Sequence, residues 1–269
     1  MDPRNLFLAA GECLGCADVD GKLLLTDATA AAFAAGHLVS FDNGTVAPVG
    51  EPGRPARPRL VDPRALPQRG LGTQAGRAAL VHAVAHIEFN AINLAWDAVQ
   101  RFRDMPDEYY RDWIGVAVDE ARHFRLLRTR LAELGHAYGD FDAHDGLWEM
   151  AVKTSASCME RMALVPRVLE ARGLDVTPAM IARLRHAGDE ATAAILDVIL
   201  REEVAHVAAG SRWFAWCCER AGADPKQEFV RLVGQHAKGA LRPPFNEPAR
   251  LAAGFSSEEL ACLRSGFCA

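Results

Sequence analysis

The sequence predicts an all-α protein built on a bundle of four long helices with N- and C-terminal extensions. Four long segments show helical periodicity, and short stretches rich in glycine, proline and aspartate separate them. Alanine is abundant and strand-like alternation is almost absent. Alanine favours helices because its side chain loses no conformational entropy there. Half of the 269 residues are hydrophobic, which is enough for a large core.

Helix boundaries are expected at caps and breakers. The four main helices are predicted over residues 73–103, 107–134, 147–171 and 189–220. Asp107 is the expected cap of the second helix and Gly135 its stop. The third helix is expected to bend near Pro166 and to end at Gly173. A short helix is then expected to start at Thr177-Pro178, because proline fits the first turn of a helix.

The same pattern predicts three regions along the chain. Residues 1–70 form an extension with short helices near 6–10 and 28–35 and a proline-rich segment that cannot hold a regular helix. Residues 71–222 form the helical bundle. Residues 223–269 form a tail that packs on the bundle, with an extended stretch at Pro243-Pro244.

Polar residues interrupt the apolar stripes of three of these helices. Positions i, i+3, i+4 and i+7 share one face of a helix. Glu120 and His123 are the polar members of an otherwise apolar stripe on the second helix. Glu203 and His206 occupy the same place on the fourth helix, and Glu88 on the first. Buried carboxylates are costly unless they are paired, so these groups predict bound cations.

The spacing of these residues fits a site for two metal ions. In Glu-x-x-His, a carboxylate and an imidazole one turn apart can reach the same transition-metal ion. Ferritin-like sites use two such motifs and one glutamate from each of the other two helices. The sequence has Glu120/His123, Glu203/His206 and Glu88, so the fourth carboxylate must come from the third helix. Iron is the favoured metal, with manganese or a mixed Fe/Mn pair as alternatives.

Two residues of the third helix compete for that role, Glu170 and Glu160. Glu88 precedes Glu120 by 32 residues and Glu170 precedes Glu203 by 33, whereas Glu160 precedes it by 43. If the bundle consists of two similar helix pairs, Glu170 is the counterpart of Glu88. Glu160 also shares its face with charged residues, so Glu170 is favoured and Glu160 stays open as the alternative.

Other polar and aromatic residues are assigned to structural roles. His82 and His86 lie on a polar face of the first helix, rotated away from Glu88; a separate metal pair is the alternative, but a role in supporting the metal ligands or in contacting another helix is favoured. Tyr109, Tyr110 and Trp113 precede Glu120 and are expected to pack in the core.

Composition restricts the compartment and the partners. The net charge is −5 and no long basic run occurs, so nucleic acid is not an expected partner. No apolar run reaches the roughly 18 residues of a membrane span. Seven scattered cysteines favour a reducing, cytoplasmic compartment. Cys13 and Cys16 form a lone C-x-x-C without the second pair that a zinc site needs, and their role is left open.

Several segments together resemble a bacterial family of ferritin-like proteins catalogued as a domain of unknown function. They are HIEFNAINLAWDAVQRF, DEARHFRLL, WEMAVKT, ALVPRVLEARGLDVTP, EEVAHVAAGSRWF and RPPFNEPARLAAGF. The likeness covers residues from about 65 to 255. It implies a ferritin-like fold and no particular reaction.

The pattern is more distantly similar to diiron tRNA hydroxylases, in which the glutamate of an I-E-A-R segment is a metal ligand. Here LEAR occupies residues 169–172, so the likeness implies Glu170 as a ligand. It implies the same role for Glu88, Glu120, His123, Glu203 and His206. The chain departs from that pattern after residue 172 and in its long extensions, so the tRNA substrate does not follow.

These observations favour an oxidoreductase that activates dioxygen at two ferrous ions and then hydroxylates or oxidises an organic molecule. A small-molecule substrate and an external electron donor are expected. No glycine-rich nucleotide fingerprint is present, so a built-in flavin or nicotinamide domain is not expected. A homodimer fits this picture. The alternative is a non-enzymatic protein that binds or detoxifies iron or manganese.

Overall fold

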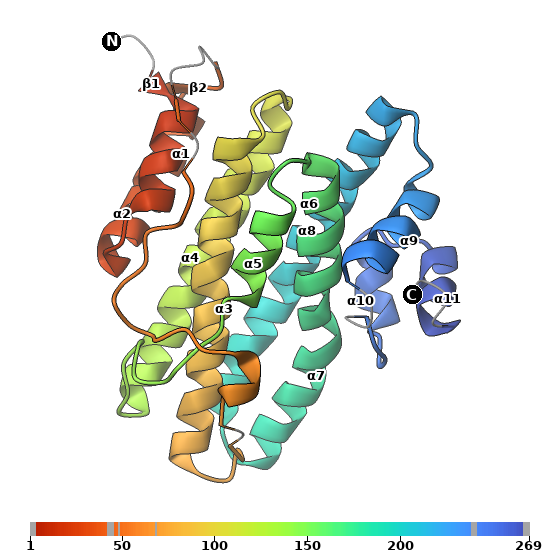
Figure 1. The fold of residues 1–269 in the computed structure, drawn as a ribbon. Coiled ribbons are helices and arrows are strands. Elements are labelled where there is room, and N and C mark those ends of the chain that lie inside the picture. Colours follow the sequence, from red (N-terminus) through yellow and green to blue (C-terminus); the bar gives the residue numbers. More distant parts are fainter. Residues whose placement is uncertain (1–3, 42–45, 48, 68, 238–240, 266–269) are drawn as a thin grey trace. The chain divides into compact units, whose positions relative to one another are not determined.

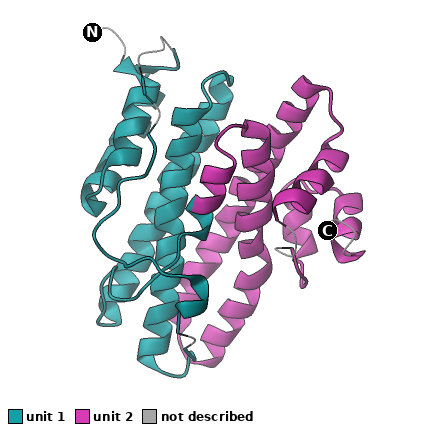
Figure 2. Ribbon diagram, viewed as in Figure 1, with its two compact units in different colours: residues 1–148 teal, residues 149–269 magenta. Residues whose placement is uncertain are grey.

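The computed structural model describes residues 4–41, 46–47, 49–67, 69–237 and 241–265, and within these ranges the protein is all-α. Parts of the expected extensions, including Pro48 of the proline-rich segment, lie outside them. The chain divides into two compact units, residues 1–148 and 149–269, coloured separately in Figure 2. The three regions expected from the sequence stay a prediction beside this division.

Unit 1 is organised around the long helices α3 and α4, which lie side by side (Figure 1). Helix α1 packs on α3 and helix α2 on α4, and the two short strands pair in parallel. The elements are β1 (Arg4–Asn5), α1 (Leu6–Gly15), α2 (Val19–Ala34), β2 (Leu38–Val39), the 3-10 turn η1 (Pro63–Ala65), α3 (Gln74–Arg101) and α4 (Asp107–Glu133).

Unit 2 is organised around α8, against which α6, α7 and the π-helical turn between them pack. Helix α5 (Gly146–Lys153) crosses from one unit into the other. The remaining elements are α6 (Cys158–Leu164), the π-helical turn η2 (Val165–Glu170), α7 (Ala171–His186), α8 (Glu190–Ala221), α9 (Pro225–His236), α10 (Glu247–Ala252) and α11 (Ser257–Ser265).

Three of the four predicted main helices begin and end within about two residues of their expected bounds. The Thr73 hydroxyl caps α3 by accepting the Gly76 N–H at 3.0 Å, and the Asp189 carboxylate accepts the Thr192 N–H at 3.0 Å at the start of α8. Helix α4 starts at Asp107, but Pro106 and not Asp107 holds the capping position. Gly135 follows α4 at φ 76°, a conformation that favours glycine.

The prediction for the third helix was wrong in two places. The chain breaks between α5 and α6, where no break was expected, and α7 continues through Gly173 and Pro178 to His186. Proline has no N–H, so Pro178 leaves the Leu174 carbonyl without its helical donor. The Asn246 side-chain amide donates to that carbonyl at 3.1 Å. A residue of the C-terminal tail therefore compensates for the proline.

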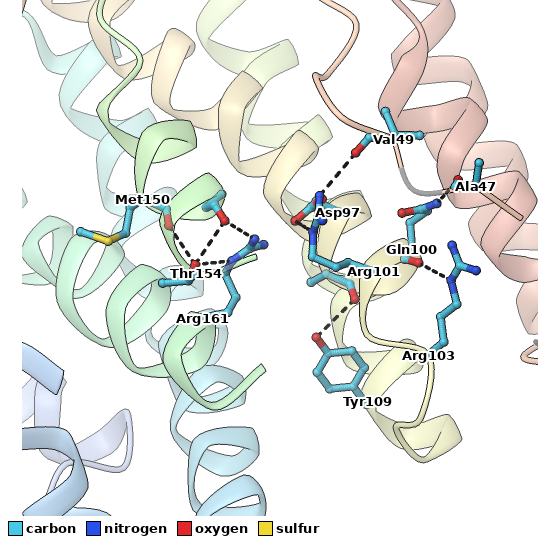
Figure 3. A network of polar contacts seen from close by, with 12 residues as sticks. Ala47, Val49, Asp97, Gln100, Arg101, Arg103, Tyr109, Met150, Thr154 and Arg161 are labelled. Carbon is cyan, nitrogen blue, oxygen red and sulfur yellow. Dashed lines mark hydrogen bonds and ion pairs between the residues drawn. The ribbon is translucent and has the colours of Figure 1, made fainter. Parts of the chain in front are cut away.

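Arg161 spans the break between α5 and α6 (Figure 3). Its guanidinium is buried, with Nε donating to Thr154 Oγ1 at 2.8 Å and Nη2 to the Ala151 carbonyl at 2.6 Å. Thr154 Oγ1 in turn donates to the Met150 carbonyl at 2.8 Å. These bonds satisfy carbonyls at the end of α5 that have no helical partner.

The extended segment before η1 is held to unit 1 by side chains at the end of α3 (Figure 3). Gln100 Nε2 donates to the Ala47 carbonyl at 2.9 Å, and Arg101 Nη2 reaches the Val49 carbonyl at 3.4 Å. Arg101 also binds Asp97, with its Nη2 at 2.6 Å from Oδ1. These bonds satisfy backbone carbonyls in a segment without regular secondary structure.

Helix α3 is long and apolar enough to cross a membrane, but 72% of its most apolar window is buried within the protein. A core helix of a globular protein has the same properties.

Candidate metal centre

Helices α3 and α4 bring Glu88, Glu120 and His123 together inside unit 1. His123 Nδ1 lies 3.1 Å from Glu88 Oε2 and 3.5 Å from Glu120 Oε2. One ligand atom from each of the three residues lies within 4.8 Å of the other two. All three side chains are buried, as the stripes predicted.

Burial and mutual repulsion change how these groups bind protons. Desolvation and the neighbouring Glu120 carboxylate raise the pKa of Glu88 to about 8. Desolvation lowers the pKa of His123, but hydrogen bonds with Glu120 and Glu88 outweigh it and raise that pKa to about 11. A proton on Glu88 and another on His123 therefore balance the buried negative charge. A divalent cation among the same atoms supplies the same compensation.

Glu203 and His206 lie one turn apart on α8 in unit 2. His206 Nδ1 is 3.4 Å from Glu203 Oε1, and the His206 ring is buried. The pair has the same spacing as Glu120/His123 and offers the same donors, one carboxylate and one imidazole.

Glu170 is the last residue of the π-helical turn η2, which packs against α8. Pro166 in this turn has no N–H to donate to the preceding helical turn, which accounts for the departure from α-helical bonding. Its ring lies against Gly210 of α8, where a Cβ would meet the Pro166 ring at 2.4 Å. Gly210 is one turn from His206, so Pro166 packs on the stripe that carries the Glu-x-x-His pair. The Oε2 atom of Glu170, four residues after Pro166, is buried.

Glu160 has different surroundings. It lies in the first turn of α6, half-buried, and its backbone N–H donates to the Ser157 capping hydroxyl at 3.2 Å. The hydrogen bond with Glu228 is the main cause that raises the pKa of the Arg231 guanidinium in α9. The charge of Glu160 raises that pKa further. Glu160 therefore lies near a basic group of α9.

His82 and His86 contact the loop that follows α4. His86 Nδ1 lies 2.9 Å from the Tyr138 hydroxyl, and His82 Nε2 accepts the Gly139 N–H at 2.9 Å. Burial lowers the pKa of both imidazoles to about 4. Both rings are therefore neutral at physiological pH, and both hold the loop to α3, whereas the sequence favoured contact with another helix or with the metal ligands.

Tyr138 is a member of this region that sequence reasoning missed. Its ring lies 5.0 Å from that of Phe124 and 5.5 Å from that of Phe89, centroid to centroid. Phe124 and Phe89 each follow a predicted ligand directly in the chain. Tyr138 lies in a loop, where no helical periodicity indicates which side chains are buried. Its position shortly after Gly135 was the one signal in the sequence. Tyr109 and Tyr110 pack in the core, with their hydroxyls on the Ala98 and Phe102 carbonyls.

Residues 15–261 match the sequence pattern of a protein family described as "Protein of unknown function (DUF455)". The chain belongs to this family. An uncharacterised protein of Haemophilus influenzae is 45% identical over 213 residues, covering 77% of this chain and 74% of that protein. No solved structure matches the chain.

Proposed function

We propose that this DUF455 protein binds two metal ions through buried glutamate and histidine side chains. Glu88, Glu120 and His123 would provide one half of the ligand set, and Glu170, Glu203 and His206 the other. The repeated pattern supports this, because each half contains one glutamate followed by one Glu-x-x-His pair. Iron is the favoured metal for this oxygen- and nitrogen-rich donor set, with manganese or a mixed pair as alternatives.

The observation that carries the proposal is the burial of two carboxylates beside an imidazole in unit 1. Repulsion between Glu88 and Glu120 costs stability unless a positive charge lies between them. A bound divalent cation would offset this repulsion, as the protons on Glu88 and His123 do in its absence.

Two ferrous ions with open coordination positions can bind and reduce dioxygen, which would make the protein a hydroxylase or oxidase. The chain's own contribution is to hold the donors in place and to surround them with buried apolar side chains such as Phe89 and Phe124. We propose a small organic substrate, a separate electron donor, a homodimer and a cytoplasmic location.

Titration of the metal-free full-length protein with ferrous iron under nitrogen tests the site. We expect two ions per chain, and a transient visible absorption when air is admitted. Glu120→Ala and His206→Ala should each lower the stoichiometry by at least one ion while the far-ultraviolet circular dichroism stays unchanged. Asp119→Ala is the matched control, because Asp119 pairs with Arg122 at the surface. Unchanged iron binding in both test variants would refute the site.

A second pair of variants tests the choice on the third helix. Glu170→Ala should lower the affinity for the second iron at least tenfold, because it removes a charged donor. Glu160→Ala should leave iron binding unchanged, since Glu160 lies near Arg231. Equal losses in the two variants, measured by the same titration, would leave Glu170 unsupported.

Particle size distinguishes the enzyme from the storage alternative. A monomer or dimer in light scattering agrees with an enzyme that acts on a small molecule. A closed cage of many chains that mineralises iron would instead support iron storage.

A further inference from the structure

Two thiols far apart in the sequence meet in unit 2. Cys158 is the first residue of α6 and Cys217 lies near the end of α8, and these helices pack on each other. The two side chains form a hydrogen bond with each other. Both residues are half-buried and both thiols are reduced. The pair is therefore close enough to react and open enough for a small oxidant to reach.

The surroundings of Cys217 favour its thiolate. The hydrogen bond with Cys158 and the charge of Arg220 lower the pKa of Cys217, although partial burial opposes them. Arg220 lies over the Trp216 ring, 4.8 Å from its centroid, which keeps the cation at this end of α8. Thiolates and not thiols are the nucleophiles in cysteine oxidation.

The other described thiols differ from this pair. Burial raises the pKa of Cys13 and of Cys218 to about 11. Cys13 contacts the Thr29 hydroxyl at 3.3 Å and Cys16 donates to the Asp18 carbonyl at 3.5 Å, so the C-x-x-C motif makes local structural contacts. Among the described residues, no group of three or more metal-binding side chains forms around Cys158 and Cys217. Disulfide chemistry therefore fits this pair better than metal binding.

We propose that Cys158 and Cys217 are a site of reversible oxidation by hydrogen peroxide that joins α6 to α8. The Cys217 thiolate attacks one peroxide oxygen, the O–O bond breaks, and the departing hydroxide takes a proton to leave as water. The Cys158 thiolate then attacks the resulting sulfenic sulfur, forms the S–S bond and releases a second water. The two thiols lose two electrons and two protons, and the peroxide is reduced to two waters.

The disulfide would link the start of α6 to the end of α8. The chain continues from α6 through η2 to Glu170, and α8 carries Glu203 and His206. The cross-link would therefore restrict movement between the two elements that carry these residues. The chemistry does not depend on a bound metal, so it stands or falls separately from the proposed function.

Peptide mapping of the oxidised full-length protein tests this proposal. The protein is treated with a small excess of hydrogen peroxide, blocked with iodoacetamide and digested without reduction. We expect a peptide in which Cys158 is linked to Cys217, an intact mass lower by two hydrogens, and full reversal by dithiothreitol. The same result in Glu120→Ala would show that the metal site is not required.

Single substitutions provide the controls. Cys158→Ser and Cys217→Ser should each abolish the linked peptide, and Cys13→Ser should leave its yield unchanged. Over-oxidation of Cys217 in the native protein without a link to Cys158 would overturn the proposal. So would new peroxide-induced links that join Cys158 or Cys217 to other cysteines. The mapping of the unsubstituted protein decides the question even if a serine variant folds poorly.

Discussion

The helix pair of unit 1 and the helix pair of unit 2 present the same ligand pattern on different backbones. In unit 1, Glu88 lies within the uninterrupted helix α3. In unit 2, Glu170 lies at the end of a π-helical turn that contains a proline. Val84 precedes Glu88 by four residues, as Pro166 precedes Glu170. Leu127 follows Glu120 by seven residues, as Gly210 follows Glu203. The same donor set is thus compatible with two ways of packing one helix on another.

Two buried cations, Arg167 in unit 2 and Lys22 in unit 1, are compensated in different ways. In unit 2, Arg167 lies among the rings of Phe214, Phe229 and Phe255, at 4.9, 4.3 and 4.5 Å from their centroids. Its Nη2 donates to Glu259 at 2.7 Å, so the charge is paired. In unit 1, the buried Lys22 amine donates to the Cys13 and Leu14 carbonyls at 2.7 and 2.8 Å. A carboxylate neutralises the first cation, whereas the second donates to backbone carbonyls and lies 5.8 Å from the centroid of the Phe89 ring.

The largest expected loss of stability comes from removing the carboxylate that pairs with Arg167 in unit 2. Glu259→Ala leaves the Arg167 guanidinium buried without its carboxylate, which typically costs about 3–5 kcal/mol. Arg167 lies in η2, so amide hydrogen exchange should speed up in η2 and α11 and stay unchanged in α3 and α4. Glu258→Ala is the control, because its pair with Lys226 is at the surface and such pairs contribute about 0–1 kcal/mol. Equal destabilisation by both variants would contradict this account of unit 2.

The next effect concerns the contact that distinguishes the two helix pairs. Gly210→Ala places a Cβ 2.4 Å from the Pro166 ring, so η2 must move away from α8. We expect a loss of about 1–3 kcal/mol in urea unfolding, the usual cost of overpacking. Gly173→Ala in α7 meets no atom within 4 Å and should stabilise the protein by about 0.5–1 kcal/mol. A neutral Gly210→Ala would show that the close approach is not needed.

The elements predicted well from the sequence are those set by local interactions. Thr73 and Asp189 cap α3 and α8 through backbone groups three residues away, and Gly135 and Gly222 follow helices with positive φ. These signals are contained within one turn of chain. The path of α7 through Pro178 depends instead on Asn246, which lies far along the sequence. No local pattern contains that information.

The candidate site shows the same contrast between local signals and long-range contacts. Glu88, Glu120 and His123 were predictable because helical periodicity places them on buried stripes, and the structure brings them together. The π-helical turn that ends at Glu170 was predicted only as a bend near Pro166. The contact of Cys158 with Cys217 was not predicted at all, because it depends on how α6 packs on α8.

The smallest expected effect sharpens the comparison of the two buried cations. Burial lowers the pKa of Lys22 from 10.5 to about 8, so above pH 8 the folded protein binds fewer protons here than the unfolded chain. Stability therefore rises with pH through this window, and the penalty is fully present below pH 8. Between pH 8 and 9 the native protein should gain about 1 kcal/mol relative to Lys22→Met. Urea unfolding at both pH values measures it, and a parallel response of the two proteins would show that the amine titrates normally. Lys226→Met, which changes an exposed amine, should not alter the pH response in this window.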